Sequence, residues 1–316
     1  MSTSYLPVYL GSYLRVVITT RCPLACDYCH MEGDPAQPGA EGGLETAAWI
    51  ELLRAALDTG VRKLKFVGGE PLIRRDLPEI IASLRARAAD LDISVITSGA
   101  VPRQALDRCY EAGLSRCNVT VHGFRPADFT LRGGAVRHYA LRTELIEAAL
   151  AHGRPLKLNY VYTGARCERD LMALLDWAAP RACVVNVLDD LSRPELSHES
   201  IYAALRRLRG EPVMSWDEPD PYSLPTQRLR FADGLTVEVK NRRLGEAAPW
   251  ASCSTCPQRQ ACREGIVALR LTHTGLLRPC MDRADLGVPL LPALRAGGIE
   301  GARAAWSAFM RGEGAL

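Results

Sequence analysis

A chain of 316 residues is long enough to bury a full hydrophobic core, and its length fits one large domain with a small appendage better than two equal domains. Its hydrophobic content of 47% and charged content of 24% are typical of a globular protein, and no apolar run reaches the ~18–20 residues of a membrane span. The formal net charge of +3 is too small to indicate nucleic-acid binding. Because the N-terminus has no basic segment followed by an apolar stretch, we expect no signal peptide and a cytoplasmic location.

Short apolar runs alternate with helical patterns from residue 14 to about residue 208. The runs predict strands at Leu14–Thr20, Lys63–Val67, Ile93–Thr97, Arg116–Val121, Leu156–Tyr162 and Cys183–Leu188. Helices are predicted at Leu44–Asp58, after the N-cap candidate Asp76, and at about 103–112, 138–152, 168–179 and 197–208. Six β/α repeats indicate a parallel sheet with crossover helices, so we predict an α/β fold, a partial (β/α)6 TIM-like barrel.

The pattern changes after this region. Residues 211–225 are rich in Pro, Asp and Glu and are interpreted as a linker or a cap over the barrel. Beyond them, Arg228–Val239 and Val267–Arg278 are predicted to be hairpins, and two short helical stretches close the chain. We therefore predict a barrel domain at 1–210 and a small separate C-terminal domain at 226–316.

Eleven cysteines in a chain without an export signal indicate metal binding or catalysis rather than a disulfide framework. The first group, Cys22, Cys26 and Cys29, has the spacing C-x3-C-x2-C. Three thiolates on one loop can hold three irons of a [4Fe–4S] cluster and leave the fourth iron open for a cofactor. The alternatives are a zinc site, to which His30 could add a ligand, and a chance grouping of structural cysteines.

A Gly-Gly-Glu-Pro segment begins at Gly68, directly after the second predicted strand. With this motif the sequence resembles the radical S-adenosylmethionine (SAM) superfamily, whose signature is C-x3-C-x-Φ-C with an aromatic Φ. The resemblance implies that SAM chelates the open iron, that the glycine-rich segment contacts SAM, and that reductive cleavage yields a 5′-deoxyadenosyl radical. The cofactor-binding residues implied are Tyr28, Gly68, Gly69, Glu70, Pro71, Ser98 and Thr120. The hydroxyls among them could equally belong to turns or strands.

A second group of cysteines, Cys253, Cys256, Cys262 and Cys280, has the spacing C-x2-C-x5-C-x17-C of another metal site. By spacing alone, a four-thiolate zinc ribbon is an equal alternative. The pattern resembles the shortened auxiliary-cluster domains of radical SAM proteins, called twitch domains, and in part the longer SPASM pattern. That resemblance implies a second [4Fe–4S] cluster at 226–316. It leaves open whether all four cysteines bind or an iron is free to bind substrate.

Most of the chain also resembles the GTP 3′,8-cyclases of molybdenum cofactor biosynthesis. The similar segments are Tyr13–Arg15, Gly60–Asp76, Lys157–Asn159 and Leu269–Cys280. The resemblance implies that Arg15, Lys157 and Arg270 face the substrate. Asn159 and His122 follow strands and are expected to contact the substrate as well, whereas the acidic pair Asp189 and Asp190 is expected in a solvated loop.

Two family arginines are absent: one falls on Ala268, and a phosphate-binding one is replaced around Cys183. Their loss removes charge-assisted hydrogen bonds to a triphosphate. We therefore expect a substrate other than GTP, namely a nucleoside, a sugar or an amino-acid-derived intermediate. GTP cyclisation, peptide maturation and a non-enzymatic barrel stapled by metal are the alternatives. A reductant such as flavodoxin or ferredoxin is the expected partner; a membrane and nucleic acid are not.

Overall fold

The computed structural model describes residues 9–34, 43–130, 134–181, 183–193, 195–196, 198–222, 226–239, 250–262 and 267–312. Six strands of this part of the chain lie parallel to one another in sequence order. They are β1 (Tyr13–Thr19), β2 (Lys63–Gly68), β3 (Asp92–Thr97), β4 (Arg116–Thr120), β5 (Leu156–Tyr162) and β6 (Val184–Asp189). The predicted parallel sheet is confirmed, and each predicted strand lies within one residue of its observed bounds.

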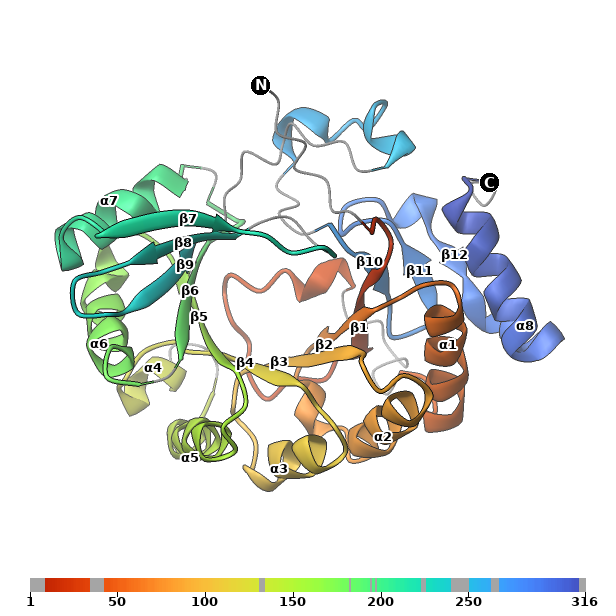
Figure 1. Cartoon of the computed structure of the whole chain (residues 1–316), viewed down its shortest axis with the longest axis horizontal. Coiled ribbons are helices and arrows are strands. Elements are labelled where there is room, and N and C mark those ends of the chain that lie inside the picture. The colour runs from red at the N-terminus through yellow and green to blue at the C-terminus, as the bar shows by residue number, and fades with distance from the viewer. Residues whose placement is uncertain are drawn as a thin grey trace.

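Helices follow the strands and cover the outer face of the curved sheet (Figure 1). They are α1 (Thr46–Asp58), α2 (Leu77–Arg87), α3 (Gln104–Glu111), α4 (Pro126–Thr130), α5 (Arg137–Ala151), α6 (Glu168–Ala178) and α7 (His198–Arg209). Asp76 occupies the N-cap position of α2 but makes no side-chain capping bond. Its carboxylate instead accepts hydrogen bonds from the Thr46 hydroxyl at 2.6 Å and from Arg74 Nε at 3.0 Å. The β/α order and the curvature establish the partial barrel.

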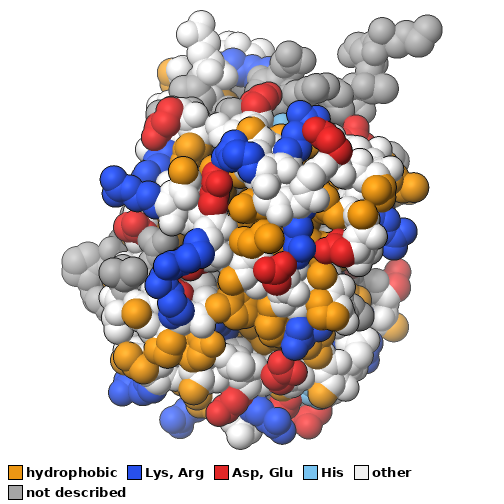
Figure 2. Space-filling model, turned by 90° about the vertical axis from the view of Figure 1, so that its left-hand side faces the viewer, with side chains coloured by type: hydrophobic (Ala, Val, Ile, Leu, Met, Phe, Trp, Pro, Cys, Tyr) orange, Lys and Arg blue, Asp and Glu red, His pale blue; other side chains and the backbone are white. Residues whose placement is uncertain are grey.

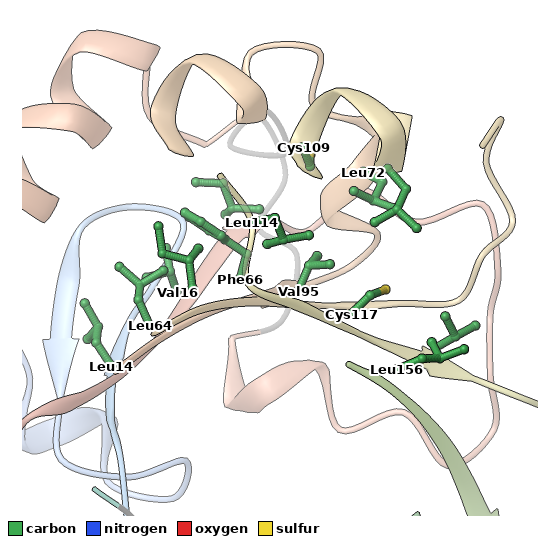
Figure 3. Close-up of a cluster of buried hydrophobic side chains, with 14 of the residues drawn as sticks. Leu14, Val16, Leu64, Phe66, Leu72, Val95, Cys109, Leu114, Cys117 and Leu156 are labelled. Atoms are coloured by element: carbon green, nitrogen blue, oxygen red, sulfur yellow. The ribbon is translucent and has the colours of Figure 1, made fainter. Parts of the chain in front are cut away.

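The core lies between the sheet and this layer of helices. Alternate strand residues, such as Leu64 and Phe66 of β2, point outward and pack against the helices, as Figure 3 shows. Cys109 and Cys117 belong to the same core and are buried in it. The strand residues that alternate with these outward-facing ones point into the barrel, and Lys65, between Leu64 and Phe66, is one of them. The barrel interior is therefore free to carry polar side chains while the helix layer supplies the apolar burial.

Both edges of the barrel sheet are extended by strands from the C-terminal third of the chain. On one side lie β7 (Met214–Glu218), β8 (Thr226–Arg230) and β9 (Thr236–Val239), and on the other β10 (Leu269–Leu271), β11 (Leu276–Arg278) and β12 (Val288–Pro289). The order is β12-β11-β10-β1-β2-β3-β4-β5-β6-β9-β8-β7. The predicted linker at 211–225 is corrected, because it contains β7, which pairs with β8. The strands of 226–316 continue the barrel sheet rather than form a sheet of their own.

The chain ends in α8 (Leu290–Met310), which packs against α1 and is interrupted at Gly297 and Gly298, so the two predicted helical stretches are present. Short 3-10 turns lie at Met31–Gly33, Pro71–Ile73, Ala165–Cys167, Ala251–Cys253, Arg259–Ala261 and Ala284–Leu286. No helix in the described ranges combines the length and the apolarity needed to cross a membrane. On the face next to α6 and α7, basic and acidic side chains alternate with apolar ones, so the charge there is mixed in sign (Figure 2).

Candidate active site

The three cysteines of the first group lie on the loop after β1, at the carboxyl ends of the parallel strands. Cys22 and Cys29 are exposed and Cys26 is half-buried. All three line one cavity of about 270 Å³. Among the described residues, no three Cys, His, Asp or Glu side chains converge at the spacing of a metal site. The donor set nevertheless fits an iron–sulfur cluster, because three thiols of one loop border the same cavity and thiolates are the ligands that such clusters take.

The Gly-Gly-Glu-Pro segment runs beside the start of the cysteine loop. The backbone N–H of Gly69 donates to the Thr19 carbonyl, and that of Glu70 to the Arg21 carbonyl, both at 2.8 Å. A Cβ on Gly68 would lie 2.2 Å from the Thr19 oxygen, and a Cβ on Gly69 would lie 2.2 Å from the Arg21 oxygen. The two glycines are therefore required where these backbones meet, and both also line the cavity.

The side chain of Glu70 is buried and joins this segment to the end of β3. Its carboxylate accepts hydrogen bonds from the Thr97 hydroxyl at 2.7 Å, the Ser98 backbone N–H at 2.7 Å and the Ser98 hydroxyl at 2.6 Å. Burial raises the pKa of Glu70, and these hydrogen bonds oppose that rise because they favour the ionised form. Ser98 lines the cavity, whereas Glu70 and Pro71 are buried behind its wall and hold it in place.

Tyr28 and His122 meet at the same cavity. The Tyr28 hydroxyl lies 2.7 Å from Nδ1 of His122, and Nε2 of His122 lies 4.0 Å from the Cys26 sulfur. Thr120, the last residue of β4, also lines the cavity. The structure thus brings Tyr28 and Thr120, expected at the cofactor, together with His122, expected at the substrate, beside the cysteine loop.

Arg15 of β1 and Arg270 of β10 are partners in strand register, and both line the cavity while being 4% and 1% exposed. Glu32 lies between them: Arg15 Nε donates to Oε2 of Glu32 at 2.9 Å, and Arg270 Nε lies 3.7 Å from the same oxygen. Burial would raise the pKa of Glu32, but the adjacent Arg15 guanidinium holds it far below its usual range. Two residues expected at the substrate therefore share one carboxylate.

Lys65 of β2 lines the same cavity and is absent from the residues that we expected at the site. Within the described part of the chain it makes no hydrogen bond or ion pair. Burial, followed by the charges of Arg116 and Arg15, lowers the pKa of Lys65 well below its usual value. The alternation of Lys63 and Lys65 with apolar residues in this strand is the sequence signal that could have found it. We call Arg15, Lys65 and Arg270 the cation wall.

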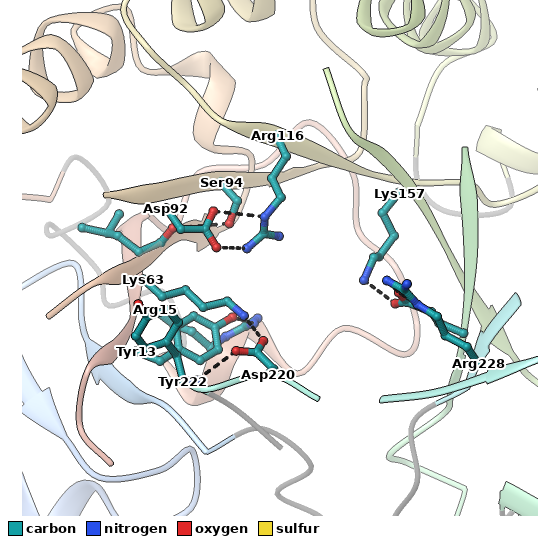
Figure 4. Close-up of polar contacts among 12 residues, drawn as sticks. Tyr13, Arg15, Lys63, Asp92, Ser94, Arg116, Lys157, Asp220, Tyr222 and Arg228 are labelled. Atoms are coloured by element: carbon teal, nitrogen blue, oxygen red, sulfur yellow. Dashed lines mark hydrogen bonds and ion pairs between the residues drawn. The ribbon is translucent and has the colours of Figure 1, made fainter. Parts of the chain in front are cut away.

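Lys157 lines a second cavity, of about 460 Å³, at the amino ends of the strands. It forms an ion pair with Glu238 of β9, which Arg228 of β8 also contacts at 3.0 Å. Figure 4 shows Lys157 and Arg228 across the barrel from Arg15. Lys157 therefore faces the second cavity, at the start of its strand, whereas Arg270 lines the first, and the role of Lys157 at the substrate stays a prediction. The two cavities share Arg15, Lys65, Asn118 and Asn186.

Three further polar residues border the first cavity. Asn159 of β5 accepts a hydrogen bond from Asn186 of β6 at 2.9 Å. Asp189 and Asp190 are 6% and 3% exposed, so the expected solvated loop is wrong for this pair. The Asp190 carboxylate accepts from the backbone N–H of Ser192 at 3.0 Å and from its hydroxyl at 2.6 Å. These contacts fold the carboxylate back onto its own turn.

The two positions where family arginines are missing lie apart from this site. Ala268 is buried just before β10, and Cys183 is half-buried just before β6. Neither belongs to the lining of the two cavities described here. The alanine and the thiol themselves supply no charge to either cavity.

The four cysteines of the second group, Cys253, Cys256, Cys262 and Cys280, are all half-buried. Arg283, three residues after Cys280, lies beside the Cys256 thiol, so the two parts of the group approach the same region. Residues 240–249 and 263–266, within the predicted C-terminal domain, lie outside the described residues. A second cluster held by these four cysteines stays a prediction, as does its assignment to a twitch or SPASM domain.

Comparisons with known proteins agree with this geometry. The family model of the radical SAM superfamily matches residues 16–178. A probable GTP 3′,8-cyclase of Methanococcus maripaludis strain C5 is 30% identical over 289 residues, which are 90% of this chain and 89% of the relative. The GTP 3′,8-cyclase of Caulobacter vibrioides is 29% identical, covering 87% of this chain and 76% of the relative.

Among solved structures, SuiB of Streptococcus suis bound to S-adenosylmethionine is similar in fold, with a TM-score of 0.57 and 13% identity. The similarity covers 86% of this chain, which spans only 60% of the length of SuiB. At this identity the likeness concerns the fold.

Proposed function

Because the chain belongs to the radical SAM superfamily and is related over 90% of its length to GTP 3′,8-cyclases, we propose that it cyclises a purine nucleoside triphosphate, with GTP as the substrate. It is a radical SAM enzyme, as the cysteine spacing and the Gly-Gly-Glu-Pro segment indicated. The relatives favour GTP over the other small molecules that the two missing arginines suggested.

The cation wall is the observation that carries the proposal. Arg15, Lys65 and Arg270 direct three basic side chains to the cavity that the cysteine loop borders. Glu32 balances the charge of Arg15 and approaches Arg270, but Lys65 has no anionic partner within the described ranges. A phosphate beside Lys65 would raise its pKa and form charge-assisted hydrogen bonds. A polyanionic nucleotide therefore suits this wall better than a neutral sugar or nucleoside.

The cofactor would occupy the other side of the cavity. Cys22, Cys26 and Cys29 would hold a [4Fe–4S] cluster with one open iron. When bound, the cluster supplies the electron that cleaves SAM to methionine and a 5′-deoxyadenosyl radical. Gly68, Gly69, Ser98 and Thr120 border the space between the cysteines and the substrate and would orient SAM there. A flavodoxin or ferredoxin would reduce the cluster, and the second cysteine group would hold an auxiliary cluster.

The test is SAM cleavage by the anaerobically reconstituted and reduced protein, with and without GTP. We expect 5′-deoxyadenosine to form in a GTP-dependent manner together with a cyclised nucleotide, both measured by liquid chromatography and mass spectrometry. Lys65→Ala should raise the KM for GTP at least tenfold, whereas Arg87→Ala, on the exposed outer side of α2, should not change it. Formation of 5′-deoxyadenosine at the same rate without GTP, and with no nucleotide product, would contradict the proposal.

A further inference from the structure

His122 lies just after β4, and its backbone is held from both sides. The backbone N–H of Val121 donates to the Asn159 carbonyl of β5 at 2.8 Å. On the other side, Gly123 has a φ of 154°, and a Cβ there would lie 2.1 Å from the buried carboxylate of Asp128. The sheet and this packed turn therefore fix where the imidazole stands, and the residue is only 8% exposed.

Both ring nitrogens of His122 face the cysteine loop. Nδ1 lies 2.7 Å from the Tyr28 hydroxyl, and Nε2 lies 4.0 Å from the Cys26 sulfur, a long contact for a hydrogen bond to sulfur. The rings of Tyr28 and His122 are tilted by 40° with their centroids 6.0 Å apart, so they meet through the hydroxyl and not face to face. The imidazole thus bridges a cysteine and an aromatic residue of the same loop.

The two contacts determine which nitrogen of a neutral imidazole carries the hydrogen. A cysteine that binds iron is a thiolate, which accepts hydrogen bonds and has none to donate. Nε2 must therefore carry the hydrogen to bind Cys26, because a bare nitrogen would set its lone pair against those of the sulfur. Nδ1 is then an acceptor, and the Tyr28 hydroxyl can donate to it. Tyr28 thus selects the tautomer that presents an N–H to the sulfur.

We propose that His122 donates a hydrogen bond from Nε2 to the cluster-binding thiolate of Cys26, that Tyr28 orients it, and that this pair raises the reduction potential of the cluster. Reduction by one electron from a flavodoxin or ferredoxin adds one negative charge to the cluster, and the Nε2 hydrogen stays on the imidazole throughout. Because the N–H offsets part of the thiolate charge, it favours the reduced form.

His122, which we expected at the substrate, is then a positioning residue that acts on the cluster through Cys26. The reduced cluster is the form that cleaves SAM, so the hydrogen bond lets a less strongly reducing donor start the reaction. The inference rests on the part of the proposed function that places a cluster on the first cysteine group, and it does not depend on GTP as the substrate.

The reduction potential of the anaerobically reconstituted protein, without SAM or GTP, tests the proposal. It is measured by titration at controlled potentials, following the electron paramagnetic resonance signal that Cys22→Ala removes. His122→Leu should lower the potential until the ratio of reduced to oxidised cluster falls about tenfold, a shift of about 59 mV for one electron. Tyr28→Phe should shift the potential in the same direction but by less, because the ring stays and only the tautomer is released.

Two further variants separate the hydrogen bond from packing. His122→Gln keeps an N–H about as far along the side chain as Nε2, so it should restore most of the potential that His122→Leu loses. The matched control for loss of an imidazole is His152→Leu. His152 follows α5, its Nε2 lies 2.9 Å from Asp107, and it does not line the cavity of the cysteine loop, so the potential should not change.

The inference is overturned if His122→Leu keeps the wild-type potential, if His122→Gln falls as far as His122→Leu, or if wild-type protein lacks the signal that depends on Cys22. Should His122→Leu hold no iron, an unchanged potential in Tyr28→Phe overturns it instead. The proposed function is judged separately, by turnover of GTP. A potential that depends on His122 without GTP turnover would leave the hydrogen bond standing and refute the cyclase, whereas GTP turnover with an unchanged potential in His122→Leu would do the opposite.

Discussion

The carboxylate of Asp34 accepts two hydrogen bonds from His273, one from its backbone N–H at 2.8 Å and one from its imidazole Nδ1 at 2.7 Å, across 239 positions of sequence. Both residues are buried. Beside them, Nη1 of Arg278 donates to the Gly33 carbonyl at 2.6 Å. The end of the cysteine loop is thus anchored to the β10–β11 hairpin, in addition to the contact of Glu32 with Arg15 of β1.

Removing this anchor should destabilise the protein. Asp34→Ala leaves the two buried donors of His273 without their acceptor, so we expect the free energy of unfolding to fall by about 2–3 kcal/mol. The matched control is Asp285→Ala, which removes an exposed carboxylate paired with Arg283 and should leave the free energy of unfolding almost unchanged. Urea denaturation of both variants measures the difference, and equal losses would show that the anchor contributes no more than a surface pair.

Glu32 should contribute to stability against acid. Its pKa is lower in the folded protein than the ordinary value of 4.5, so the unfolded chain takes up the proton first as the pH falls. The stabilisation is therefore present above about pH 4.5 and is lost as the pH falls below it. We expect Glu32→Gln to lower the free energy of unfolding at pH 7 by about 2 kcal/mol and to flatten its decline between pH 5 and 3.

Guanidinium denaturation at a series of pH values tests this dependence. Glu300→Gln, at a carboxylate that is 70% exposed and pairs only with Arg303 among the described residues, is the control and should leave the pH profile unchanged. If the free energy of unfolding declined equally with falling pH in wild type and Glu32→Gln, Glu32 would not be the source of the stability against acid.

Lys65 should oppose stability in the protein without ligand. Because its pKa is lowered in the folded protein, the unfolded chain binds the proton more tightly, and the resulting penalty is present at neutral pH and disappears above about pH 10.5. Lys65→Met should therefore raise the free energy of unfolding at pH 7 by about 1–2 kcal/mol. The same change should abolish most of the thermal stabilisation by tripolyphosphate. If Lys65→Met were less stable than wild type, the inference that Lys65 is a buried cation without an anionic partner would be refuted.

The two cysteine groups should differ in what their loss removes. Wild-type protein reconstituted without air should hold about eight irons, and Cys22→Ala should lower this to about four and stop SAM cleavage. Cys256→Ala should also lower the iron to about four but keep slow SAM cleavage. Cys183→Ala, outside both groups, is the control for loss of a thiol. If wild-type protein instead held about four irons together with zinc, and Cys256→Ala lost the zinc but no iron, the second group would be a zinc ribbon.

The sequence predicted what depends on local pattern. The alternation of apolar runs and amphipathic helices specified the six parallel strands, and the cysteine loop and Gly-Gly-Glu-Pro segment followed from motifs at strand ends. It missed β7 because an edge strand with mostly exposed or half-exposed residues carries no apolar run. It could not tell which end of the barrel Lys157 and Arg270 face, because the position of a residue along its strand decides this and requires the observed register.

Lys65, Asn118 and Asn186 were missed for a different reason. Inward-facing polar residues look like errors in an apolar strand until the helix layer is known to provide the core. The pairing of β1 with β10, across more than 250 positions, has no local signature at all.

This pairing has a consequence for how the protein is made. A ribosome releases β1 early, and β2 to β6 can pair beside it in turn, but one edge of β1 stays open until Leu269–Leu271 has emerged. Until then Asp34 has no His273 to bind, and the end of the cysteine loop lacks its contact with the β10–β11 hairpin. Until β10 is made, this open edge of β1 is exposed to pairing with other extended chains, so the C-terminal third of the chain is the part that protects the barrel sheet from aggregation.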